Sequence, residues 1–181
     1  MPKPKSSPTW RDVKQVITSI PRDGLLRLIH DLYEHDQDVR DFVNARFLRD
    51  DDTLVAYKTK LRQCLVIKSG WDFDKISVSK AKSVIAAYKK SKGDIAGMAE
   101  LCVTYVEYAC ETFNEHDMSD YGAFYSAFDG MIAQACAYIA QVPVQAQPAL
   151  VLRLHAAQSP FVDSNHATEF AKYGFDTLID A

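Results

Sequence analysis

The densest group of reactive side chains lies in one short stretch, where His30, Asp31, Glu34 and His35 occur close together. Imidazole and carboxylate groups are common zinc ligands and common general acids and bases. Asp31 and His35 are four residues apart and face each other on a helix. The two histidines point roughly 140° apart on a regular helix, so they cannot both reach one metal ion. We interpret the group as a solvated helix end, with a metal site as the alternative, and predict no metal ligands.

His116 and the cysteines are the other candidates for chemistry. His116 lies between Glu115 and Asp117 at the expected C-terminal end of a long helix, where the helix dipole favours a cation. The cysteines have neither zinc-finger nor C-x-x-C spacing. They fall in apolar helical stretches, which predicts buried, reduced thiols of a cytoplasmic protein. These cysteines are Cys64, Cys102, Cys110 and Cys136.

The sequence contains no established catalytic or cofactor-binding motif. It has no G-x-S-x-G elbow for a nucleophile and no glycine-rich loop for phosphates or dinucleotides. We therefore predict no catalytic residues, no cofactor and a protein that is not an enzyme. An enzyme whose site is assembled from distant residues, around His30 or His116, is a third hypothesis after the two given below.

Charge is distributed unevenly along the chain, although the net charge is only -3. Residues 1–92 hold 19 Lys and Arg against 12 Asp and Glu, whereas residues 93–181 hold 2 against 12. The most basic stretch, residues 58–92, has ten Lys and Arg and two Asp. The sign changes at an expected helix boundary, so helices organise the asymmetry.

The basic stretch predicts a positive surface. On a helix over residues 79–92, apolar residues fall on one side and lysines surround the other. Such a surface can contact an acidic protein, anionic lipid heads or nucleic-acid phosphates, or it can face the acidic half of the same molecule. Nucleic acid is less favoured, because lysines act as point charges rather than as bidentate readers of bases. The candidate partner-binding residues are Lys58, Lys60, Arg62, Lys80, Lys82, Lys89 and Lys90.

Hydrophobic periodicity predicts an all-α protein. Apolar residues recur at i, i+3 or i+4 and i+7, without a sustained two-residue alternation. We expect about eight or nine helices in a single-domain helical bundle or a short solenoid of antiparallel helix pairs. The longest predicted helices cover residues 94–115 and 120–141, each with a broad apolar face. Shorter helices are predicted over residues 9–19, 22–35, 36–47, 54–68, 79–92, 149–158 and 164–173.

Local signals predict several helix ends. Ser77 or Ser79 can cap the lysine-rich helix, and Asp94 can cap the long helix that follows. Gly93 stands at the position after a basic last turn that glycine prefers. Gly174 is the expected terminator of the last predicted helix.

The ends of the chain indicate its organisation and location. Three prolines within residues 1–8 predict a flexible tail, and residues 9–181 read as one helical domain. The N-terminal segment lacks the apolar core of a secretory signal. No window approaches the 18 or so apolar residues of a membrane span, so we expect a cytoplasmic protein.

The segment LLRLIHDLY at residues 25–33, followed by residues 36–42, resembles the opening of a bacterial family of small helical proteins of unknown function. Further similar segments are residues 81–93, YVE at 105–107 and YGFD at 173–176. The resemblance covers most of the chain. It implies a helical bundle or a short solenoid and a bacterial protein, and it supplies no catalytic residues to carry over.

These observations predict a non-catalytic protein–protein interaction or adaptor domain. Docking would be steered by charge through the lysine-rich face and weakened by salt. The alternative is a nucleic-acid-associated protein that uses the same face. Self-association is also expected to be possible, because halves of opposite sign attract each other between molecules.

Overall fold

The computed structural model describes residues 8–48, 51–67, 75–116, 122–158, 170 and 172–179, without the side chains of 51–53, 158, 177 and 179. None of these residues lies in a strand, which confirms the predicted all-α class. The elements are α1 (Trp10–Ile17), α2 (Arg22–His35), α3 (Gln37–Phe47), α4 (Asp51–Leu65), α5 (Val78–Ser91), α6 (Ile95–Glu115), α7 (Gly122–Ile139), the 3-10 helix η2 (Val144–Ala146), α8 (Gln147–Gln158) and α10 (Asp176–Ile179).

The chain divides into two compact units, Met1–Val43 and Asn44–Ala181, with the boundary inside α3. The single domain over residues 9–181 stays a prediction. Three predicted features lie wholly or largely outside the described residues: the tail at 1–8, the loop at 69–77 and the helix at 164–173.

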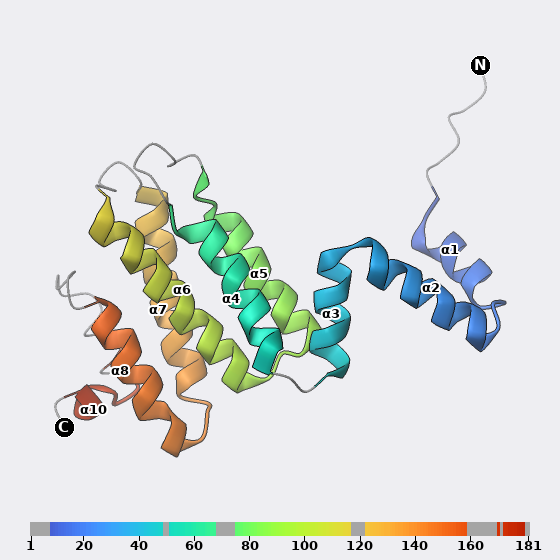
Figure 1. Ribbon diagram of the computed structural model, residues 1–181. Coiled ribbons are helices and arrows are strands. Elements are labelled where there is room, and N and C mark those ends of the chain that lie inside the picture. The colour runs from blue at the N-terminus through green and yellow to red at the C-terminus, as the bar shows by residue number, and fades with distance from the viewer. Residues whose placement is uncertain are drawn as a thin grey trace. The chain divides into compact units, whose positions relative to one another are not determined.

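The second unit is organised around α6, which packs against α4, α5, α7 and α8. Figure 1 shows α6 between α4 and α8, with α7 behind it. This placement explains the broad apolar face that the sequence shows, because a helix with several neighbours must bury several sides. The fully buried side chains include Leu101, Tyr105 and Val106 of α6 and Ile132 of α7.

Local sequence signals determine where α5 begins and ends and where α6 begins. Ser77, one of the two serines predicted for this role, accepts a hydrogen bond from the Lys80 amide and caps α5. Gly93 adopts a left-handed φ of 62°, and its amide donates to the Tyr88 carbonyl at 3.1 Å. A side chain at Gly93 would meet the Lys89 carbonyl oxygen at 2.6 Å, so glycine is required in this turn. Asp94 then caps α6 through the Gly97 amide at 2.8 Å.

The first unit does not bury the apolar stripes that its sequence shows. In the predicted helical bundle the apolar sides of α1 and α2 would be buried, yet neither helix contains a buried residue. Val16 of α1 and Leu26 of α2 are each more than half exposed. Periodicity correctly identifies one apolar side of each helix, but it does not say whether another element covers that side.

Candidate functional site

The four predicted lysines of α5 lie at the surface. Lys80, Lys82, Lys89 and Lys90 are exposed, whereas the opposite side of α5 is buried. Among the residues that the structure describes, none of the four lysines forms an ion pair. The helix has no acidic residue to offset them. The buried residues of α5 are Ala81, Ile85, Tyr88 and Ser91.

The three predicted bases of α4 are engaged within the molecule. Lys58 is paired with Glu100 of α6 at 2.6 Å. Arg62 reaches Glu111 of α6, with its Nη1 donating to Oε2 at 3.0 Å. The ammonium of Lys60 lies 6.0 Å from the centre of the Tyr57 ring. The acidic half of the chain therefore neutralises part of the predicted face, and the exposed cations that remain are mainly those of α5.

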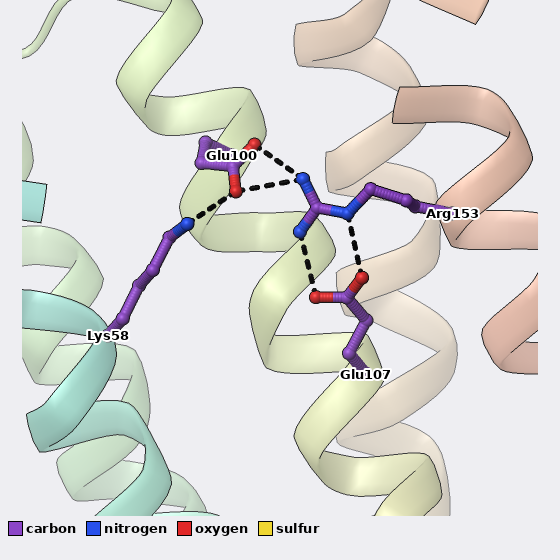
Figure 2. Close-up of polar contacts among 4 residues, drawn as sticks. All are labelled: Lys58, Glu100, Glu107 and Arg153. Carbon is purple, nitrogen blue, oxygen red and sulfur yellow. Dashed lines mark hydrogen bonds and ion pairs between the residues drawn. The ribbon is translucent and has the colours of Figure 1, made fainter. Parts of the chain in front are cut away.

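Arg153 joins two carboxylates of α6 to α8 (Figure 2). Its Nε and Nη2 donate to Glu107 at 2.8 and 2.9 Å, a bidentate geometry. Its Nη1 donates to both oxygens of Glu100 at 2.9 and 2.8 Å. Lys58 approaches Glu100 from α4, so two cations and two anions bind three helices together.

The charges of this network stabilise one another. Burial by itself would raise the pKa of Glu100, but hydrogen bonds and charge from Lys58 and Arg153 outweigh burial and lower it. The hydrogen bonds to Glu107 and then to Glu100 raise the pKa of Arg153, against the effect of burial. Glu100 and Arg153 are therefore both ionised at neutral pH.

A groove of about 840 Å³ opens beside this network, between α4, the start of α6 and the start of α8. Its ionisable groups are already engaged with one another: Lys58 with Glu100, and Tyr88 and Lys92 with Asp94. The remainder of the described lining is mostly apolar. The lining residues are Leu54, Val55, Lys58, Tyr88, Lys92, Asp94, Ala96, Gly97, Glu100, Ala146 and Leu150.

Tyr88 and Asp94 connect the groove to the core. The Tyr88 hydroxyl donates to Asp94 Oδ2 at 2.6 Å, while Oδ1 of the same carboxylate caps α6. Burial, together with the hydrogen bond to Asp94, raises the pKa of Tyr88 well above its usual value. Burial would raise the pKa of Asp94, but hydrogen bonds from Tyr88 and the Gly97 amide and the charge of Lys92 lower it. The pair is thus a neutral phenol that donates to an ionised cap, and neither group is activated for proton abstraction.

The cysteines are free, as predicted. Cys102, Cys110 and Cys136 are buried, whereas Cys64 is only partly buried, which differs from the expectation for all four. Burial raises the pKa of Cys102 and Cys110 to about 12. Thiols with such a high pKa are protonated at neutral pH and act as apolar packing groups.

The predicted histidine sites lie at helix ends or on exposed surface. His30 and His35 are exposed on α2, with His35 in its last turn. His116 is the C-cap of α6, where we expected a helix-end role. Across the described part of the chain, no group of three or more His, Cys, Asp or Glu could hold a metal ion.

The Tyr105 hydroxyl is a buried polar group whose effect on stability can be measured by removing it. Its side chain is buried, its hydroxyl has no hydrogen-bond partner among the described residues, and burial raises its pKa to about 12. An unpaired buried hydroxyl costs about 1–3 kcal/mol, so Tyr105→Phe should leave the free energy of unfolding unchanged or raise it by about 1 kcal/mol. Urea denaturation at pH 7 measures the change.

Tyr57→Phe is the matched control for this test. The Tyr57 hydroxyl is buried and lies 3.3 Å from Ser91 Oγ, so its removal should cost about 1 kcal/mol. A loss of stability in Tyr105→Phe as large as that in Tyr57→Phe would mean that the Tyr105 hydroxyl has a partner after all.

Sequence reasoning missed the network of Glu100, Glu107 and Arg153. A signal was present, because residues 93–181 contain only two bases and Arg153 is one of them. The seven-residue spacing of the two glutamates also places them on one side of α6. The sequence could not show that α8 would bring Arg153 to them.

A scan of protein-family models found no match to the chain, and neither did searches of curated proteins and of solved structures. The resemblance to a bacterial helical family therefore stays an expectation. No helix in the described ranges is both long enough and apolar enough to cross a membrane.

Proposed function

We propose that the protein is a non-catalytic protein–protein interaction module that docks an acidic partner on the outer side of α5. The observation that carries the proposal is the exposure of Lys80, Lys82, Lys89 and Lys90 on one helix that contains no acidic residue. Unlike Lys58 and Arg62, these lysines form no ion pair among the described residues.

The surface between the lysines also suits a protein partner. Ser83, Ala86 and Ala87 are exposed beside them, and such small side chains let a partner backbone approach while the long lysines reach its carboxylates. Charges at an interface of this kind mainly accelerate association and select partners of opposite sign. Binding should weaken as salt rises, because exposed charges are screened within about 8 Å at physiological ionic strength.

The test uses the full chain as bait in an extract of its source cells. A variant that carries Lys80→Glu, Lys82→Glu, Lys89→Glu and Lys90→Glu should lose an acidic protein that the natural chain retains at low salt. With that partner purified, the double variant Lys82→Glu/Lys89→Glu should bind about tenfold more weakly at low salt, with most of the loss in the association rate.

The matched control reverses two exposed bases that lie on other helices. Lys14→Glu/Arg27→Glu makes the same change in net charge on α1 and α2, and it should bind the partner like the natural chain. If Lys82→Glu/Lys89→Glu bound the partner as tightly as the natural chain does, the proposal would be overturned. A mobility shift with mixed DNA and RNA at two salt concentrations tests the alternative, nucleic-acid association through the same lysines.

A further inference from the structure

One side of α2 carries a row of apolar side chains that no other described part of its own compact unit covers. Leu26, Ile29 and Leu32 are 54%, 50% and 48% exposed, and they follow one another at three-residue spacing. A 14-residue helix without buried residues gains little from its own hydrogen bonds in water, because helices of this length depend on packing of an apolar side. Such a row on a surface marks an interaction site.

The exposed apolar residues of α2 are arranged symmetrically about Ile29. Leu26 and Leu32 are equidistant from it on either side. In a two-fold interface residue i of one copy meets residue j of the other, and j meets i in return. An antiparallel pair of α2 helices with its axis at Ile29 therefore places Ile29 against Ile29 and Leu26 against Leu32 twice.

The charges at the two ends of the row follow the same symmetry. Arg22 lies seven residues before Ile29 and Asp36 seven residues after it, and seven residues are nearly two helical turns, so both lie near the apolar side. Both residues are exposed, and Arg22 forms no ion pair with any described residue. The position of Asp36 is fixed, because its Oδ1 accepts the amides of Asp38 and Val39 at 2.7 and 3.1 Å.

These charges select the orientation of the pair. An antiparallel arrangement brings Arg22 of each copy to Asp36 of the other, whereas a parallel one would bring Arg22 to Arg22 and Asp36 to Asp36. Two other charged residues of α2, Arg27 and Asp31, lie on the opposite side of the helix. We propose that α2 is a self-association surface, on which a second copy of this chain docks antiparallel across a two-fold axis at Ile29.

The dimer should be weak and concentration-dependent. A single helix pair buries less than the roughly 1,200 Å² typical of a stable interface. Exposed apolar side chains of α1 in the same compact unit, among them Val13 and Val16, could enlarge it. We expect a Kd of about 1–50 µM.

Sedimentation velocity of the full chain from about 1 to 200 µM spans this range and should show a monomer–dimer equilibrium. Ile29→Glu places two carboxylates together at the axis and should raise the Kd at least about a hundredfold without unfolding the chain, because residue 29 is exposed. Arg27→Glu, on the opposite side of α2, is the control and should dimerise like the natural chain.

Cysteine cross-linking tests the orientation, in a Cys64→Ser background that removes the one partly exposed native thiol. Ile29→Cys should form a covalent dimer with itself, and Leu26→Cys should cross-link to Leu32→Cys in a mixed sample. A chain that remains monomeric at 200 µM, a dimer unaffected by Ile29→Glu, or Leu26→Cys that links mainly to itself would each overturn the proposal. The α5 lysine variant should dimerise normally, so this outcome is independent of the proposed docking function.

Discussion

Gly97→Ala is expected to lower the free energy of unfolding by about 3 kcal/mol, at the upper end of the usual cost of overpacking a core. A Cβ at Gly97 would lie 1.9 Å from the Tyr88 hydroxyl oxygen and 2.5 and 2.8 Å from two ring carbons. Tyr88 is fully buried and its ring packs edge-on against Tyr57, with ring centres 5.2 Å apart, so moving the ring disturbs the core. Displacing it also breaks the 2.6 Å hydrogen bond to Asp94, the cap of α6. Thermal and urea unfolding of the variant measure the loss.

Gly130→Ala is the matched control and should change stability in the opposite direction. Gly130 also lies inside a helix, but a Cβ there would meet nothing within 4 Å. Alanine at an exposed helical position should raise the free energy of unfolding by about 0.5–1 kcal/mol, because glycine loses more conformational freedom on folding. Replacing glycine with alanine should thus change the free energy of unfolding in opposite directions at these two helical positions. The difference comes from the Tyr88 side chain beside Gly97.

A double-mutant cycle identifies Tyr88 as the cause. Tyr88→Leu removes the ring and hydroxyl that the new methyl group would meet. Gly97→Ala should therefore cost less than about 1 kcal/mol in a Tyr88→Leu background, a coupling that only residues in contact show. An unchanged cost of Gly97→Ala in that background would locate the strain elsewhere.

Features that depend on near neighbours in the chain could be predicted from the sequence. Asp94 as a cap and Gly93 as a left-handed terminator follow from hydrogen bonds that close within a few residues. The buried side of α5 follows from helical periodicity in the same way. By contrast, nothing local shows why position 97 must be glycine, because the limiting contact comes from a side chain of another helix.

The candidate surface was predicted only in part, because its charges find distant partners. The sequence leaves open whether Lys58 and Arg62 face a partner or the acidic half of the same molecule. In the structure their carboxylates lie 42 and 49 residues further along the chain. In α2, hydrophobic periodicity predicted an apolar side of the helix, but it could not show that this side is exposed. In both cases the missing information is which elements pack together, and that depends on the whole chain.

Arg153→Met is expected to lower the free energy of unfolding by about 2 kcal/mol at pH 7. The methionine retains much of the arginine stem but leaves Glu107 without its bidentate partner and Glu100 with Lys58 alone. Breaking a buried ion pair typically costs about 3–5 kcal/mol, and an exposed one at most about 1 kcal/mol. Because the Arg153 side chain is 38% exposed and that of Glu100 is 19% exposed, an intermediate cost is expected.

Arg62→Met is the matched control for Arg153→Met. Arg62 also pairs with a glutamate of α6, but its side chain is 50% exposed, so its loss should cost less than about 1 kcal/mol. Similar costs at the two positions would mean that the shared Glu100 and Glu107 contacts of Arg153 add nothing to a simple surface pair.

Acid should reduce the difference between the natural chain and Arg153→Met. The pKa of folded Glu100 is lowered from its ordinary value of 4.5, so its contribution to stability is present above that value and is lost as pH falls through the lower, folded pKa. In Arg153→Met this contribution is smaller from the start, because much of the charge that lowers the pKa is gone. The free energies of unfolding of the natural chain and of Arg153→Met should therefore converge as pH falls from about 5 to 3. A difference in free energy that does not change with pH would instead assign the cost to lost packing of the arginine stem.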